Sequence, residues 1–190
     1  GERLDGLLRT RVDHLSGILN GIDTEEYDPE KDPVLVKNYT ADSFDAKVEN
    51  KLALQRMMGL REEADTPVMA IVSRLVSHKG LDLICEVLHD MMELPIQLVI
   101  LGKGDQKYEE FFHWASQQYH GRMAVCLDYN EALSMAIYSG ADLFLMPSKS
   151  EPCGLSQMIA MRYGTVPIVR ETGGLKDTVH AYQAWNDSGN

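Results

Sequence analysis

The stretch "PVMAIVSRLVSHKGLDLICEVLHDMMELPIQLVILG", residues 67–102, decides the fold. Its two unbroken apolar runs, 67–73 and 96–102, are typical of strands that are buried on both faces of a parallel sheet. Between them, residues 80–93 carry leucine, isoleucine and methionine at helical spacing, which predicts a helix. A strand, a helix and a second strand in this order form a right-handed βαβ unit.

The same alternation continues towards the end of the chain. The sequence predicts further helices over 105–120, 130–140, 154–164 and 174–182, and further strands over 123–129, 141–148 and 166–170. Asn130 is expected to cap the second of these helices. Repeated βαβ units with short connections predict the α/β class, with a doubly wound, Rossmann-like parallel sheet.

The part of the chain before this alternation is less regular. Residues 16–21 favour a short strand and turn, and the Asp- and Pro-rich residues 23–44 favour a surface segment. A helix is expected from Asp45 to Gly59. The residues predicted for its apolar face are Val48, Leu52, Met57 and Met58.

Length and composition limit the functions that the chain can have. The 190 residues, 44% of them hydrophobic, suit a single domain over 1–190. The net charge of −11 argues against nonspecific nucleic-acid binding. No apolar run approaches the roughly 20 residues of a membrane span, and no secretory signal opens the chain.

The cysteines and histidines do not suggest a metal. The three cysteines and six histidines lack metal-ligand spacing, so we expect no metal, reduced thiols and a cytoplasmic location. The glycines of "LGKGDQ" (101–106) begin a dinucleotide fingerprint, but Lys107 stands where the third glycine belongs. Tight turning explains these glycines, and no cofactor is expected.

Ligands of such sheets bind at the carboxyl ends of the strands, so the loops that follow strands are the candidate site. Arg74 and Lys79 follow the first strand and precede a helix, which makes an anion site. Two solvated surface cations are the alternative. The turn formed by Thr172, Gly173 and Gly174 could offer backbone amides to a pyrophosphate, as the second half of the same site.

The loop "EPCGLSQ" (151–157) carries the most unusual residues. Glu151 would face the cleft as an acceptor for hydroxyls, and Gly154 lets the backbone approach a ligand. Cys153 could be a nucleophile at a helix start, but the loop holds no histidine to act as its base. Glu151 could be a glycosidase nucleophile, but no second carboxylate is nominated. A small packing role suits Cys153 better.

These motifs together resemble the bacterial glycogen synthases and the plant starch synthases. The segments that carry the resemblance are "LSGILNGID" (15–23), "SRLVSHKGLDL" (73–83), "DYNEALS" (128–134) and "PSKSEPCGLSQMIAMRYGTVPIVRETGGLKDTV" (147–179). The resemblance covers nearly the whole chain from about residue 15. It implies the C-terminal, nucleotide-binding lobe of a GT-B glycosyltransferase fold.

The resemblance also implies roles for individual residues. Arg74 and Lys79 would hold the distal phosphate and stabilise the leaving diphosphate, and Glu151 would bind the transferred glucose. Tyr129 would stack on adenine, and Asn20 would lie near the donor cleft. The backbone at Cys153, Gly154 and Leu155 would contact glucose, and that at Thr172, Gly173 and Gly174 would line the phosphates.

The implied activity is transfer of glucose from ADP-glucose to the non-reducing end of an α-1,4-glucan, with retention. The resemblance implies that the lobe that bears the acceptor surface, and the terminal return helix, lie outside residues 1–190. We therefore expect the isolated chain to bind ADP or ADP-glucose without transferring glucose. Two alternatives are a GT-B domain that uses another donor, such as UDP-glucose, and a non-catalytic glucan-binding module.

Overall fold

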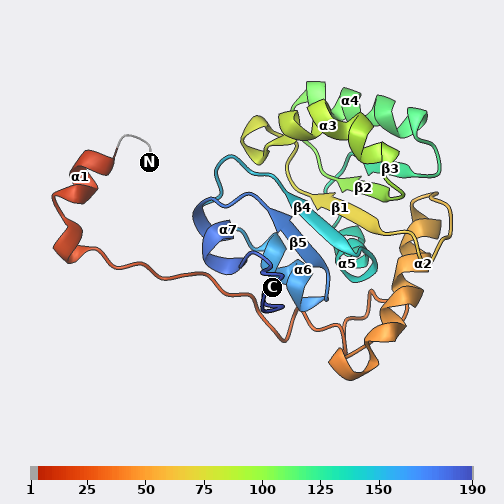
Figure 1. Ribbon diagram of the computed structural model, residues 1–190, viewed down its shortest axis with the longest axis horizontal. Helices are drawn as coiled ribbons and strands as arrows, with labels where there is room; N and C mark the ends of the chain where they lie inside the picture. The colour runs from red at the N-terminus through yellow and green to blue at the C-terminus, as the bar shows by residue number, and fades with distance from the viewer. Residues whose placement is uncertain (1–3, 190) are drawn as a thin grey trace.

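A five-stranded parallel sheet organises the computed structural model, which describes residues 4–189 (Figure 1). The strands are β1 (Val68–Val72), β2 (Gln97–Leu101), β3 (Met123–Cys126), β4 (Leu143–Met146) and β5 (Val166–Val169). Their order in the sheet is β3-β2-β1-β4-β5, and every neighbouring pair is parallel. The predicted doubly wound α/β sheet is confirmed.

Helices cover both faces of the sheet. The α-helices are α1 (Asp5–Arg9), α2 (Lys47–Met57), α3 (Leu81–Glu93), α4 (Gln106–Gln118), α5 (Glu131–Gly140), α6 (Ser156–Arg162) and α7 (Gly173–Thr178). Short 3-10 helices span Val12–His14, Ala41–Ala46 and Ser77–Lys79. Helices α3 and α4 lie together on one face, and α5 and α6 lie on the other (Figure 1). The Asn130 side chain accepts a hydrogen bond from the Leu133 amide and caps α5 as predicted.

Each face of the sheet has its own hydrophobic core. Leu98 and Ile100 of β2 pack with α3 and α4, whereas Val99 and Leu101 of the same strand belong to the core on the opposite face. All five residues of β2 are buried. Burial on both faces explains why the sequence shows continuous apolar runs rather than alternation.

The strand order reverses beside β1. The chain runs from β1 outward to β2 and β3, and then returns to place β4 and β5 on the other side of β1. The carboxyl ends of β1 and β4 therefore flank a topological switch point, where open parallel sheets bind their ligands. Leu81 opens α3 and Ser156 opens α6, so the loops after these two strands end at helix starts beside the switch point.

Two predictions about the first part of the chain are wrong. Residues 16–21 form no strand but an exposed, extended segment that leads from α1 to the domain (Figure 1). The apolar face predicted for α2 is also wrong, because Val48 and Met57 are exposed. The side chains that α2 buries are Lys47, Asn50, Lys51, Leu54 and Gln55.

The polar face of α2 is buried because it meets backbone carbonyls and other polar groups. Lys47 donates to carbonyls at the ends of α5 and α6, and Lys51 pairs with Asp142 at 2.8 Å. Gln55 bonds to the Gln97 side chain at 2.8 Å. None of the helices described between residues 4 and 189 is long and apolar enough to span a bilayer.

Candidate functional site

The loop after β1 and the loop after β4 pack backbone against backbone. Gly80 has φ +74°, and a Cβ there would lie 2.0 Å from the carbonyl oxygen of Pro147. The Lys149 amide donates to the carbonyl of His78 at 2.8 Å, and the Lys149 side chain pairs with Asp82. These contacts hold the two loops at the switch point in one arrangement.

The loop after β5 joins them through its glycine pair. A Cβ on Gly173 would lie 2.1 Å from the Glu151 carbonyl oxygen, and one on Gly174 would lie 2.1 Å from that of Cys153. The Gly174 amide donates to the Glu151 carbonyl at 2.9 Å, and the Thr172 amide donates to that of Arg170. The glycines of this turn therefore serve close loop packing. No backbone carbonyl among the described residues accepts from the Gly173 amide, which lies at the first position of α7.

Lys79 and Glu151 form an ion pair where the first two loops meet. The Lys79 Nζ atom lies 2.5 Å from Glu151 Oε2, and the Ser148 hydroxyl donates to the same oxygen at 3.3 Å. The two charged side chains are only 17% and 10% exposed. Shielding from water strengthens their attraction relative to that of a surface pair.

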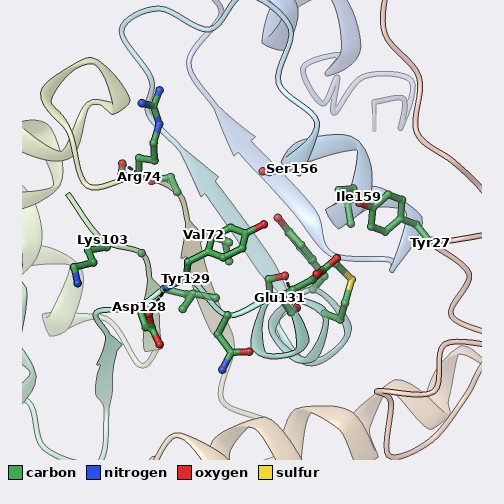
Figure 2. Close-up of a pocket in the computed structure, with 16 residues that line it drawn as sticks. Tyr27, Val72, Arg74, Lys103, Asp128, Tyr129, Glu131, Ser156 and Ile159 are labelled. Carbon is green, nitrogen blue, oxygen red and sulfur yellow. Dashed lines mark hydrogen bonds between the residues drawn. The ribbon is translucent and has the colours of Figure 1, made fainter.

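A cavity of about 420 Å³ lies at the loops after β1, β2 and β3 (Figure 2). Arg74 and Lys103 provide positive charge in its lining, and Asp128 and Glu131 provide negative charge. Its other lining residues are Tyr27, Val72, Ser73, Leu101, Gly102, Tyr129, Asn130, Ser134, Met135, Tyr138, Ser156 and Ile159. A smaller hollow of about 190 Å³ shares Arg74 and Ser156 with the cavity and extends to Lys79 and Ser148.

The cavity wall that α5 and α6 form is aromatic and partly apolar. Burial raises the pKa of Tyr138 to about 12, although a hydrogen bond with the Ser156 side chain lowers that pKa in part. Burial also raises the pKa of Tyr27, and the carboxylates of Glu26 and Glu131 add to that shift. Both phenols therefore stay protonated near neutral pH, and the cavity combines cations, aromatic rings and hydroxyls.

The glycosyl transferases group 1 family matches residues 55–189, which include the whole sheet. The chain belongs to this family. The α/β sheet matches the GT-B glycosyltransferase fold.

The similar proteins are longer than this chain. A glycogen synthase of Bacillus cereus (strain B4264) is 54% identical over 190 residues, which are 100% of this chain and 40% of that protein. A glycogen synthase of Geobacillus thermodenitrificans is 56% identical over 190 residues, which are 39% of its length. The chain therefore spans about 40% of the length of these curated relatives.

Two solved structures share the fold. The catalytic domain of starch synthase IV from Arabidopsis thaliana, bound to ADP and acarbose, is 42% identical and has a TM-score of 0.88. That match covers 94% of this chain and 37% of the other. Anabaena HepE, in complex with UDP and glucose, is 19% identical with a TM-score of 0.65, over 89% of this chain and 42% of the other, and shows the fold alone.

In this glycosyltransferase chain, several residues singled out from the sequence lie together. Arg74 and Tyr129 line the 420 Å³ cavity, Lys79 lines the adjoining hollow, and Glu151 bonds to Lys79. Tyr129 is 88% exposed, so one face of its ring is open to a ligand. Asn20 lies apart, in the exposed segment before the domain, and does not line the cavity.

The remaining residues of the loop after β4 are held by α6. Gly154 has φ +69°, and the Gln157 side chain donates to the carbonyls of Cys153 and Gly154 at 3.2 and 3.0 Å. Leu155 precedes α6 and is 46% exposed. Cys153 is a half-buried free thiol whose backbone carries the loop contacts, as a packing role requires.

The glycines of the loop after β2 also serve packing. A Cβ on Gly102 would lie 1.9 Å from the Ser73 carbonyl oxygen, and one on Gly104 would lie 2.3 Å from that of Leu75. This explains a G-x-G pair without a dinucleotide site. Among the described residues, no group of three histidine, cysteine or acidic side chains could hold a metal ion.

Sequence reasoning missed Tyr27 as a cavity residue. Tyr27 lies in the Asp- and Pro-rich segment, far from the loops after the strands, and no periodicity marks it. Figure 2 shows its ring beside Ile159 of α6, on the side of the cavity remote from Lys103. Only the path of the segment past α6 brings it there. The Arg162 side chain fixes that path by donating to the Tyr27 carbonyl at 2.9 Å.

Proposed function

We propose that residues 1–190 form the donor-binding domain of a retaining glucosyltransferase that elongates α-1,4-glucans with glucose from ADP-glucose. The glycogen synthases are 54% and 56% identical over 190 residues. The 42% identical starch synthase domain was solved with ADP and acarbose. The observation that carries the proposal is that Arg74 lines a 420 Å³ cavity at the switch point, while Lys79 lines the adjoining hollow and pairs with Glu151.

In this proposal, the diphosphate of the donor lies at the positively charged side chains of the loop after β1. Arg74 and Lys79 bind the diphosphate and stabilise the charge that develops on it as the bond to glucose breaks. Such charge-assisted hydrogen bonds contribute about 1.5–3 kcal/mol each. The Gly173 amide adds a neutral donor at the same edge, beside Thr172 and Gly174.

The two other parts of the donor extend in opposite directions from the diphosphate. The adenine stacks on the exposed ring of Tyr129, in the cavity that Tyr27 also lines. The glucose lies at Glu151, whose carboxylate accepts from sugar hydroxyls. The backbone of Cys153, Gly154 and Leu155 approaches the same sugar. Glu151 positions the glucose and is not assigned as a nucleophile.

The acceptor glucan contacts a second surface in this proposal. The relatives are about two and a half times as long as this chain, which covers 40% of one of them. Two lobes that close on the donor exclude water and direct glucose to the acceptor. Residues 1–190 alone are therefore expected to bind the donor without transferring glucose. The Asn20 side chain, on the exposed segment, is assigned to the donor cleft in the closed enzyme.

The partners and the location follow the same proposal. The net charge of −11 suits a small anionic ligand held by local cations rather than a nucleic acid. The cysteines Cys85, Cys126 and Cys153 are all free thiols, which suits the reducing cytoplasm.

Calorimetric titration of the chain with ADP, UDP and GDP tests the donor assignment. We expect ADP to bind at micromolar to millimolar concentration and more tightly than UDP or GDP. Equal affinity for the three nucleotides would contradict the adenine assignment, and tighter UDP binding would favour UDP-glucose as the donor. Absence of nucleotide binding would favour a non-catalytic glucan-binding module. A radiolabelled transfer assay with glycogen then checks that the chain alone is inactive.

A further inference from the structure

The Lys79–Glu151 pair joins two residues to which the proposed function gives different ligands. Lys79 is assigned to the diphosphate and Glu151 to the sugar, yet in this structure their charged atoms lie 2.5 Å apart. A carboxylate this close offsets the positive charge that a diphosphate needs. It also adds its own repulsion for phosphate oxygens.

Burial makes this pairing consequential. The Glu151 side chain is only 10% exposed, so water satisfies its charge only in part. Among the described residues, the Ser148 hydroxyl also donates to Glu151 Oε2, the atom that Lys79 contacts, at 3.3 Å. Nothing in the described part of the chain bonds to Oε1, and this atom is not among the fully buried ones. Lys79 is therefore the charged partner of the carboxylate, and Oε1 is open to further donors.

Sugar hydroxyls are such donors. A glucosyl group at Glu151 would place hydroxyl donors on the carboxylate and reduce its demand on Lys79, which could then hold the phosphates more strongly. We propose that the Lys79–Glu151 ion pair makes the site discriminate between the sugar nucleotide and the free nucleoside diphosphate. This inference rests on the proposed function and extends it to the release of product.

The consequence concerns the end of the reaction. Once glucose has left, Glu151 has lost its hydroxyl partners and pairs with Lys79 again. The diphosphate then competes with a buried carboxylate for the same ammonium group. Glu151 thus strengthens binding of the donor and weakens binding of the product, which opposes product inhibition.

Titration of ADP and ADP-glucose into two variants tests the inference. Glu151→Gln keeps the shape of the side chain and removes its charge, so we expect ADP to bind about tenfold more tightly than to the unmodified chain. The preference for ADP-glucose over ADP should be lost. The matched control is Glu171→Gln, because Glu171 is a 75% exposed carboxylate in the next loop, paired with Lys176. Its affinities for both ligands should be unchanged.

A second pair of variants separates the ion pair from general charge repulsion. In a Lys79→Met background the ion pair is absent, so Glu151→Gln should raise ADP affinity by a clearly smaller factor than in the unmodified chain. Thermal unfolding of each variant establishes that it is folded. The inference is overturned if Glu151→Gln binds ADP no better than the unmodified chain, or if the gain is equal in both backgrounds. Failure of the unmodified chain to bind either ligand would instead remove the proposed function itself.

Discussion

Replacement of Lys47 by methionine should reveal a buried amine that makes the stability of the chain depend on pH. Lys47 is 7% exposed, and its Nζ atom lies 2.8–3.1 Å from four oxygens. The acceptors are the carbonyls of Tyr138, Ser139 and Tyr163 and the hydroxyl of Thr165. Helices α5 and α6 end at these carbonyls, so one side chain bonds both helix ends.

The magnitude follows from the acceptors that methionine would leave. The Tyr138 carbonyl also accepts from Thr165, and the Tyr163 carbonyl also accepts from Tyr39, so neither is left without a donor. The Ser139 carbonyl loses the 2.8 Å bond. One buried acceptor without a partner and weaker bonds at the others predict a loss of about 2–4 kcal/mol in the free energy of unfolding.

The pH dependence has a definite sign. Burial lowers the pKa of Lys47 to about 7, whereas the unfolded chain keeps the ordinary value of 10.5. Between these values the unfolded chain binds one more proton than the folded chain, so the stability that Lys47 contributes rises with pH. The slope approaches about 1.4 kcal/mol per pH unit. This contribution is complete above pH 10.5 and is lost as the pH falls through 7.

Urea unfolding at intervals from pH 6 to pH 9 measures the effect. The scan stops at pH 9 because burial raises the pKa values of Tyr39 and Tyr163 far above that of a free tyrosine, and their ionisation in the unfolded chain reverses the trend above pH 10. The difference between the native chain and Lys47→Met should widen from pH 7 to pH 9. Lys37→Met is the control, since Lys37 is exposed. Parallel curves for the native chain and Lys47→Met would refute the reasoning, because they would mean that Lys47 stays charged among its four acceptors.

Three further substitutions test the site and its scaffold. Gly174→Ala should lower the melting temperature and weaken ADP binding, because the added Cβ would lie 2.1 Å from the Cys153 carbonyl oxygen. An unchanged melting curve would contradict that contact. Tyr129→Ala should weaken ADP binding by about tenfold through loss of ring stacking, and it should leave stability unchanged because Tyr129 is 88% exposed. Unchanged ADP affinity in calorimetry would mean that adenine lies elsewhere. Asn130→Ala should cost about 1 kcal/mol in urea unfolding, because it removes the α5 cap, and a neutral result would mean that water replaces the cap.

The sheet could be predicted from the sequence because its signals are local. The apolar runs at 67–73 and 96–102 lie within single strands, and the helix between them shows its own periodicity. The short connections then fix handedness and direction. The switch point followed from the same pattern, since parallel strands bring their carboxyl ends to one edge.

Long-range contacts account for what the sequence did not show. The buried face of α2 is polar because Lys47 and Gln55 meet groups 91 and 42 positions away, and no pattern within the helix indicates those partners. Tyr27 reaches the cavity only through the path of an irregular segment. The pairing of Lys79 with Glu151 depends on two loops separated by 72 positions.

The glycines of the site show why a specific sequence motif does not by itself reveal a role. The "TGG" turn was expected to offer backbone amides to a pyrophosphate, but the amides of Thr172 and Gly174 donate to carbonyls of the chain. Gly80, Gly173 and Gly174 instead let three loops meet at backbone distance. That packing places Glu151 against Lys79, since the Glu151 carbonyl accepts from Gly174 while its carboxylate reaches the loop after β1. In the proposed function these glycines therefore act on the ligand through the charged side chains that they position, and loss of one glycine should change sugar and phosphate binding together.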